Sequence, residues 1–106
     1  MRLDEDLMEE IVRRVLRVAA PERIIVFGSA AAGQMTADSD IDLLVVAPSV
    51  SNARTESVRI GDALRGLGFP FDVIVMARER FEETKDVIGG IAYPASRQGR
   101  VLYEAA

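Results

Sequence analysis

Apolar positions recur with helical spacing near the N-terminus and in short unbroken runs further along the chain. Between residues 4 and 19 they fall three or four residues apart, which predicts an amphipathic helix with this stripe: Leu7, Met8, Ile11, Val12, Val15, Leu16 and Ala19. Acidic residues lead this segment, arginines follow, and Pro21 ends it. The runs at 23–27 and 40–47 are strongly apolar and predict buried strands.

The middle of the chain predicts a second helix, over residues 52–67. Ser49 or Ser51 can cap its first turn, because a serine hydroxyl accepts a hydrogen bond from a free backbone amide. The residues expected to face inward are Val58, Ile60, Ala63, Leu64 and Leu67.

The last third of the chain is less regular. A third strand is predicted over 69–76, with its most buried part at 73–75, then a helix over 78–86 and a final strand over 101–103. A glycine pair and a proline argue against one helix that runs on to Gln98. The expected fold class is a small α/β (α+β) domain, with a mixed β-sheet of about four strands and helices packed on it.

Composition narrows the function classes. The chain has 106 residues, 49% of them hydrophobic, so we expect a single domain over 1–106 with one core. The net charge of −4 offers no general attraction to nucleic acid or to an anionic membrane. Cysteine and histidine are both absent, which excludes disulfides, thiolate metal sites and a serine–histidine triad. Without a long apolar run or a signal-peptide pattern, a cytoplasmic protein with no membrane partner is expected.

Three aspartates stand where buried strands should avoid charge. Asp40 and Asp42 flank one residue at the start of the second strand, so they share a face, with Cα atoms roughly 6.6 Å apart. Asp72 lies in the third strand, and if the two strands pair, three carboxylates meet. Such anions repel one another unless a divalent cation neutralises them, and oxygen ligands suit magnesium. The pattern therefore predicts a Mg²⁺ site at Asp40, Asp42 and Asp72.

The segment before these acids supplies features for binding phosphate. Gly28 lets the backbone approach a phosphate closely, and the turn that follows offers free amide hydrogens. The Ser29 hydroxyl can donate to a phosphate oxygen. Ser39 is expected to orient the loop before the acids, and Asp38 is more typical of a loop or capping acid.

Two other phosphate and metal motifs fit poorly. An EF-hand loop starting at Asp38 would need glycine at its sixth position and glutamate at its twelfth, where this chain has Leu43 and Ser49. A phosphate loop starting at Gly28 would need lysine followed by serine or threonine, where the chain has Gln34 and Met35. Neither motif accounts for the aspartates.

Gly28-Ser29, then Asp40-x-Asp42, then a lone strand acid at Asp72 resembles the nucleotidyltransferase superfamily of DNA polymerase β. The chain length and the ending at 99–103 resemble the minimal, MntA-like nucleotidyltransferases, which are often encoded beside HEPN-domain partners. The resemblance implies an enzyme that uses ATP or another NTP with two magnesium ions.

The resemblance also implies roles for individual residues. Asp40 and Asp42 would ligate the metals, and Asp72 would be the third ligand and the activator of the acceptor hydroxyl. Gly28, Ser29 and Ser39 would bind the nucleotide. Relatives paired with HEPN toxins transfer AMP to a tyrosine of the toxin, so the implied role is that of an antitoxin with a HEPN-type partner.

One departure from the family pattern leaves alternatives open. Many relatives carry arginines after the Gly-Ser pair, whereas this chain has Ala30, Ala31 and Ala32. An arginine would add charge-assisted bonds to phosphate. The alternatives are a weakly active or inactive module that neutralises its partner by binding, and an adenylyltransferase of small molecules. No direct nucleic-acid partner is expected, because the chain lacks a domain to hold one, and homo-oligomerisation stays open.

Overall fold

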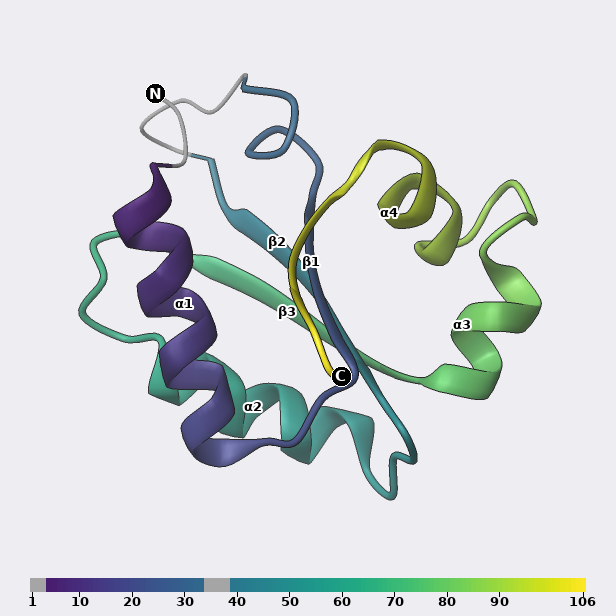
Figure 1. The fold of residues 1–106 in the computed structure, drawn as a ribbon, viewed down its shortest axis with the longest axis horizontal. Coiled ribbons are helices and arrows are strands. Elements are labelled where there is room, and N and C mark those ends of the chain that lie inside the picture. Colours follow the sequence, from purple (N-terminus) through teal and green to yellow (C-terminus); the bar gives the residue numbers. More distant parts are fainter. Residues whose placement is uncertain (1–3, 34–38) are drawn as a thin grey trace.

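The computed structural model describes residues 4–33 and 39–106, which form an α+β fold (Figure 1). Along the chain its elements are α1 (Glu5–Val18), β1 (Arg23–Phe27), β2 (Ile41–Ala47), α2 (Ala53–Ala63), β3 (Phe71–Ala77), α3 (Arg78–Thr84), α4 (Ala92–Gln98) and β4 (Arg100–Glu104). None of the helices in these ranges is long and apolar enough to cross a membrane.

The four strands of the described ranges form one mixed sheet in the order β3-β2-β1-β4. β1 pairs antiparallel with both β2 and β4, while β2 pairs parallel with β3. The connection between the parallel strands runs through α2, as a parallel pair requires a long crossover. The expected mixed sheet of about four strands with packed helices is confirmed.

Helices cover both faces of the sheet, α1 and α2 on one side and α3 and α4 on the other (Figure 1). Where the sequence suggested one core, the structure has two, and alternate residues of β1, β2 and β3 supply them, as the period of two requires. On the α1/α2 face the buried set includes Ile11, Val15, Ile24, Val26, Leu43, Val45, Ile60 and Leu64. On the α3/α4 face it is Ile25, Leu44, Val46, Phe81, Ala92 and Ala95.

The start and end of α2 differ from the prediction. Its N-cap is Asn52, whose side chain accepts from the Thr55 amide at 3.0 Å, so neither serine is the cap. The helix ends at Ala63, before 67, and Gly66 and Gly68 beyond it have positive φ.

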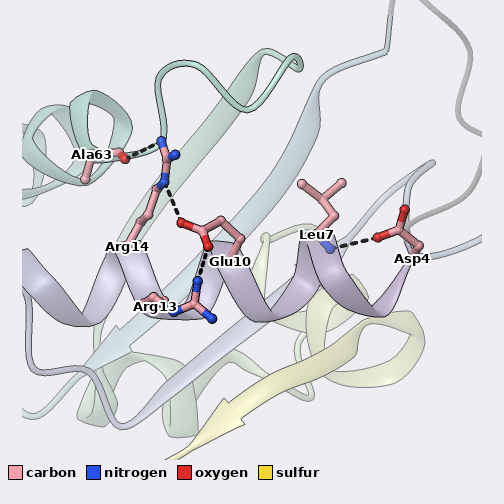
Figure 2. Close-up of polar contacts among 6 residues, drawn as sticks. All are labelled: Asp4, Leu7, Glu10, Arg13, Arg14 and Ala63. Carbon is pink, nitrogen blue, oxygen red and sulfur yellow. Dashed lines mark hydrogen bonds and ion pairs between the residues drawn. The ribbon is translucent and has the colours of Figure 1, made fainter.

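A side chain of α1 binds the end of α2. The Nη1 atom of Arg14 donates to the carbonyl of Ala63 at 3.4 Å and to that of Arg65 at 2.7 Å. Its Nε donates to Glu10 Oε2 at 2.9 Å, while Arg13 bonds the other oxygen of Glu10 (Figure 2). Arg14 therefore satisfies carbonyls that a helix end leaves free.

The burial predictions for α2 and β3 hold only in part. Ile60 and Leu64 are buried as expected, but Val58 is 55% exposed and does not face the core. In β3, Val75 is buried, whereas its neighbours at 73 and 74 are only half-buried. Both departures reflect the position of β3 at the edge of the sheet, where no strand of the described ranges flanks its outer side; Val58 lies beside Phe71 and Val73 of this strand.

One strand boundary and one helix also differ from the prediction. β3 begins at Phe71, two residues after the predicted start. The C-terminal region contains α4, a helix that the glycine pair and proline had concealed. Pro94 lies in the first turn of α4, where the missing amide hydrogen has no intrahelical partner to lose.

Candidate active site

Two of the three predicted acids lie side by side at one end of the sheet, where β2 and β3 begin. Asp42 and Asp72 are direct register partners in the parallel pairing of β2 with β3, so their Cα atoms lie about 4.8 Å apart. Asp42 also faces Phe27, the last residue of β1, across the antiparallel pairing. By strand alternation Asp42 lies on the α3/α4 face, with Leu44 and Val46. The sheet therefore assembles the pair from strands 30 residues apart in the chain.

The third acid, Asp40, directly precedes β2 and is exposed. Its charge reaches Asp42: the pKa of Asp42 is raised, first by partial burial, then by the negative charges of Asp72 and Asp40. The three carboxylates thus form one electrostatic group. Within 4–33 and 39–106, however, no three acidic side chains are already arranged to ligate a single metal ion.

The turn after β1 lies directly against this acidic group. Gly28 has φ of +73°, a conformation that side chains rarely adopt, and a Cβ there would lie 2.4 Å from Asp42 Oδ2. The turn then closes with hydrogen bonds from the Ala32 amide to the Gly28 carbonyl (3.2 Å) and from the Gly33 amide to the Ala30 carbonyl (3.3 Å). Glycine therefore leaves room for the Asp42 carboxylate in the rotamer that it adopts here.

The carboxylates and the glycine turn fit a hydrated magnesium ion in chemical type. Mg²⁺ prefers oxygen ligands and takes one or two carboxylates with waters and substrate phosphates, so it does not require a closed protein cage. The pair Asp42 and Asp72 offers that donor set, and a bound cation would offset both the partial burial and the repulsion that raise the pKa of Asp42.

Most of the predicted site residues lie together at this end of the sheet. Gly28 and Ser29 lie at the end of β1, beside Asp42 and Asp72 at the starts of β2 and β3. Ser39 is half-buried and precedes Asp40 in the connection to β2. The prediction for Asp38 concerns a residue outside the described ranges.

Two features of the site were not expected from the sequence. Gly28 was assigned to phosphate approach, but its missing side chain makes room for the Asp42 carboxylate. Ala30 is only 4% exposed and belongs to the core on the α1/α2 face, and Ala31 packs against that core. The small residues of the turn are thus partly a packing feature, which a run of alanines signals only weakly.

Comparison with solved structures identifies the class of fold. Similar structures include a toxin–antitoxin complex with AMP-PNP (TM-score 0.73, 19% identity, 92% of this chain and 73% of that chain covered). A mutant MntA–HpeT toxin–antitoxin complex gives a TM-score of 0.70 at 16% identity, with 92% and 73% covered. The Shewanella oneidensis MNT antitoxin complex with a tri-AMPylated HEPN toxin gives 0.65 at 14% identity, with 97% and 74% covered.

These likenesses show a fold shared with MNT-type antitoxin complexes. A sequence model of the nucleotidyltransferase domain matches residues 7–92, a range that includes the Gly28 turn and all three acids, and the chain belongs to this family. No curated protein matches the chain.

Proposed function

We propose that this protein is a Mg²⁺-dependent adenylyltransferase that moves AMP from ATP to a tyrosine hydroxyl of a HEPN-type partner protein and so acts as an antitoxin. Family membership supports the class of reaction. The donor and acceptor are suggested by similar structures, one a toxin–antitoxin complex with AMP-PNP and another a tri-AMPylated HEPN toxin with its MNT antitoxin.

One observation carries the proposal: the register pairing of Asp42 with Asp72 beside a glycine turn that makes room for the Asp42 carboxylate. Two neighbouring carboxylates without a compensating cation are unfavourable in a sheet, because each negative charge raises the free energy of ionising the other. A turn that can bind phosphate lies against this pair, so a triphosphate and its bound cation would contact the turn and the carboxylates together.

The residues at this edge have separable roles in the reaction. Asp40, Asp42 and Asp72 would hold Mg²⁺, which supplies positive charge against the triphosphate. The Ser29 hydroxyl and the amides of the turn would bind phosphate oxygens. Asp72 would accept the proton of the acceptor hydroxyl. At the same time the hydroxyl oxygen would form a bond to the α-phosphorus, and the bond between that phosphorus and pyrophosphate would break. The neutral amides orient the phosphates without adding negative charge.

A second function, neutralisation of the partner by binding alone, is favoured by one observation. Ala30 is buried in the core, so an arginine at this position could not contact phosphate without leaving the turn's packing. Ala32 is exposed, and it is the position of the turn where an arginine could be accommodated at the surface. The triphosphate must therefore obtain its positive contacts elsewhere, or the chain binds nucleotide weakly.

Transfer of labelled AMP separates these functions. The protein is incubated with labelled ATP, Mg²⁺ and the HEPN-type protein encoded beside it, and label on the partner is measured together with binding of the two proteins. We expect transfer by the unaltered chain, at least a hundredfold less by Asp42→Asn or Asp72→Asn, and unchanged transfer by Asp62→Asn, an exposed acid paired with Arg65.

The outcomes point in different directions. If the unaltered chain binds the partner but neither binds ATP nor labels the partner, the masking function replaces the enzymatic one. In that case Ala32→Arg provides a further test, because one charge-assisted contact should raise ATP affinity by about tenfold if the turn binds phosphate. Equal transfer by Asp42→Asn and the unaltered chain would refute the assignment of the site.

A further inference from the structure

A cavity lies at the opposite end of the sheet from the three acids. Its volume is about 390 Å³, and its floor is formed by Val45, Ile60 and Val75, all of them buried. From Asp42 to Ala47, which also lines the cavity, β2 advances five residues, or roughly 17 Å. The cavity is on the α1/α2 face and the acids on the other, so the two sites are separate.

The mouth of the cavity is polar, with one cation. Arg59 of α2 lines it together with Ser49 and Glu56, while the chain at 18–21 supplies small apolar walls. In the ranges that the structure describes, Arg59 makes no hydrogen bond, ion pair or ring contact. An apolar floor with few polar groups at the rim, in this range of volume, is typical of a small-molecule site.

The nearest acid along the helix does not neutralise Arg59. Glu56 is three residues earlier, a spacing at which opposite charges on a helix commonly pair. Its Oε2 instead accepts a hydrogen bond from the Asn52 amide at 3.3 Å, at the N-terminus of α2. Glu56 keeps its negative charge, but it is engaged with the backbone and not paired with Arg59, so the donors of the guanidinium at the mouth remain available to an anion.

We propose that this cavity binds a small anionic molecule with an apolar body, whose charged group bonds to Arg59 while its body lies on the floor of Val45, Ile60 and Val75. A carboxylate or sulfonate matches the planar fork of donors of a guanidinium. The apolar body would replace water against the buried aliphatic side chains. This site makes no use of the aspartates, and its occupancy does not depend on nucleotide transfer.

Two fluorescent probes that differ only in charge test the proposal. Anilinonaphthalenesulfonate carries an anionic group on an apolar ring system, and phenylnaphthylamine has the same rings without the charge. We expect the unaltered protein to bind one sulfonate probe per chain. Arg59→Gln should weaken this binding by at least about tenfold, the scale of one charge-assisted hydrogen bond, and leave the neutral probe unaffected.

Two further variants complete the test. Arg54→Gln removes an exposed arginine of the same helix that does not line the cavity, and it should change neither affinity. Ala20→Phe fills the cavity from an exposed residue of its wall, so the fold should tolerate it, and it should weaken both probes. Far-UV circular dichroism confirms that each variant is folded, since a disordered chain binds such probes non-specifically.

Three results would overturn the proposal. Absence of saturable binding by the unaltered protein would show that the cavity is not a site for this class of ligand. An equal loss in Arg54→Gln and Arg59→Gln would show general attraction to positive charge on α2, and full retention of binding in Ala20→Phe would place the probe elsewhere.

Discussion

Replacement of Gly28 by alanine has an effect whose size can be worked out from the geometry of the turn. At φ of +73° a residue with a Cβ costs roughly 1–2 kcal/mol relative to glycine. The new Cβ would also lie 2.4 Å from Asp42 Oδ2, so the carboxylate must leave its rotamer, which adds about 0.5–1.5 kcal/mol. Gly28→Ala should therefore lower the free energy of unfolding by about 1.5–3.5 kcal/mol.

The chain contains a matched control five residues away. Gly33 has the same φ of +73°, but nothing in the described ranges lies within 4 Å of a Cβ built there. Gly33→Ala should therefore lose only the conformational part, about 1–2 kcal/mol. Urea denaturation of both variants measures the difference, which isolates the close approach to Asp42.

A double-mutant cycle identifies the atom responsible. In an Asp42→Ala background the colliding carboxylate is gone, so Gly28→Ala should cost no more than Gly33→Ala does. The coupling between positions 28 and 42 should equal the part of the loss that Gly33→Ala lacks. Additive effects at positions 28 and 42, or equal losses for the two glycine variants, would refute the inference that Gly28 makes room for the acid.

Three further predictions concern the helices. Arg14→Gln should lower the free energy of unfolding by about 1–2 kcal/mol, because Arg14 donates hydrogen bonds to carbonyls at the end of α2. Arg13→Gln should change this free energy by less than about 0.5 kcal/mol, and urea denaturation compares the two variants. The pKa of Glu10 is lowered, first by its hydrogen bond from Arg14, so its stabilising contribution is full above the ordinary value of 4.5 and is lost as the pH falls through the lowered value. Melting temperatures of the unaltered protein and Glu10→Gln should differ at neutral pH and converge in acid; a constant gap would contradict this. Asn52→Ala should cost about 1 kcal/mol and Ser51→Ala less than about 0.5 kcal/mol, and equal losses would show that Asn52 is not the cap.

The first two strands were predictable because the patterns that define them lie within a few consecutive residues. β1 matches its predicted bounds, and β2 begins one residue later than expected. Both are short apolar runs bounded by a proline, a glycine or acidic residues, and this pattern favours a buried strand with well-defined ends. The cap of α2 was not predictable in the same way, because Ser49, Ser51 and Asn52 are all good capping residues and the choice depends on the path of the chain.

The exposure of Val58 could not be predicted from α2 alone. A helix pattern shows which residues share a face, but the sheet decides how much of that face is covered. Here β3 is an edge strand, and Val58 lies beside Phe71 and Val73 of that strand, which are only half-buried themselves. Strand order depends on contacts between residues far apart in the chain, so a local pattern does not contain it.

The acids could be singled out from the sequence, but their meeting depends on topology. A parallel pair must begin at the same edge of a sheet, and an antiparallel neighbour must end there. β2 and β3 are the parallel pair and β1 is the antiparallel neighbour, so the second residues of two strands and the residue that follows the end of a third are brought together. Asp42, Asp72 and the Gly28 turn occupy those three places, and the helices on either face do not determine their approach. It follows that substitutions in α3 or α4 that preserve the sheet should leave this edge intact, whereas a single-residue shift in the register of β3 would move Asp72 to the α1/α2 face and separate it from Asp42.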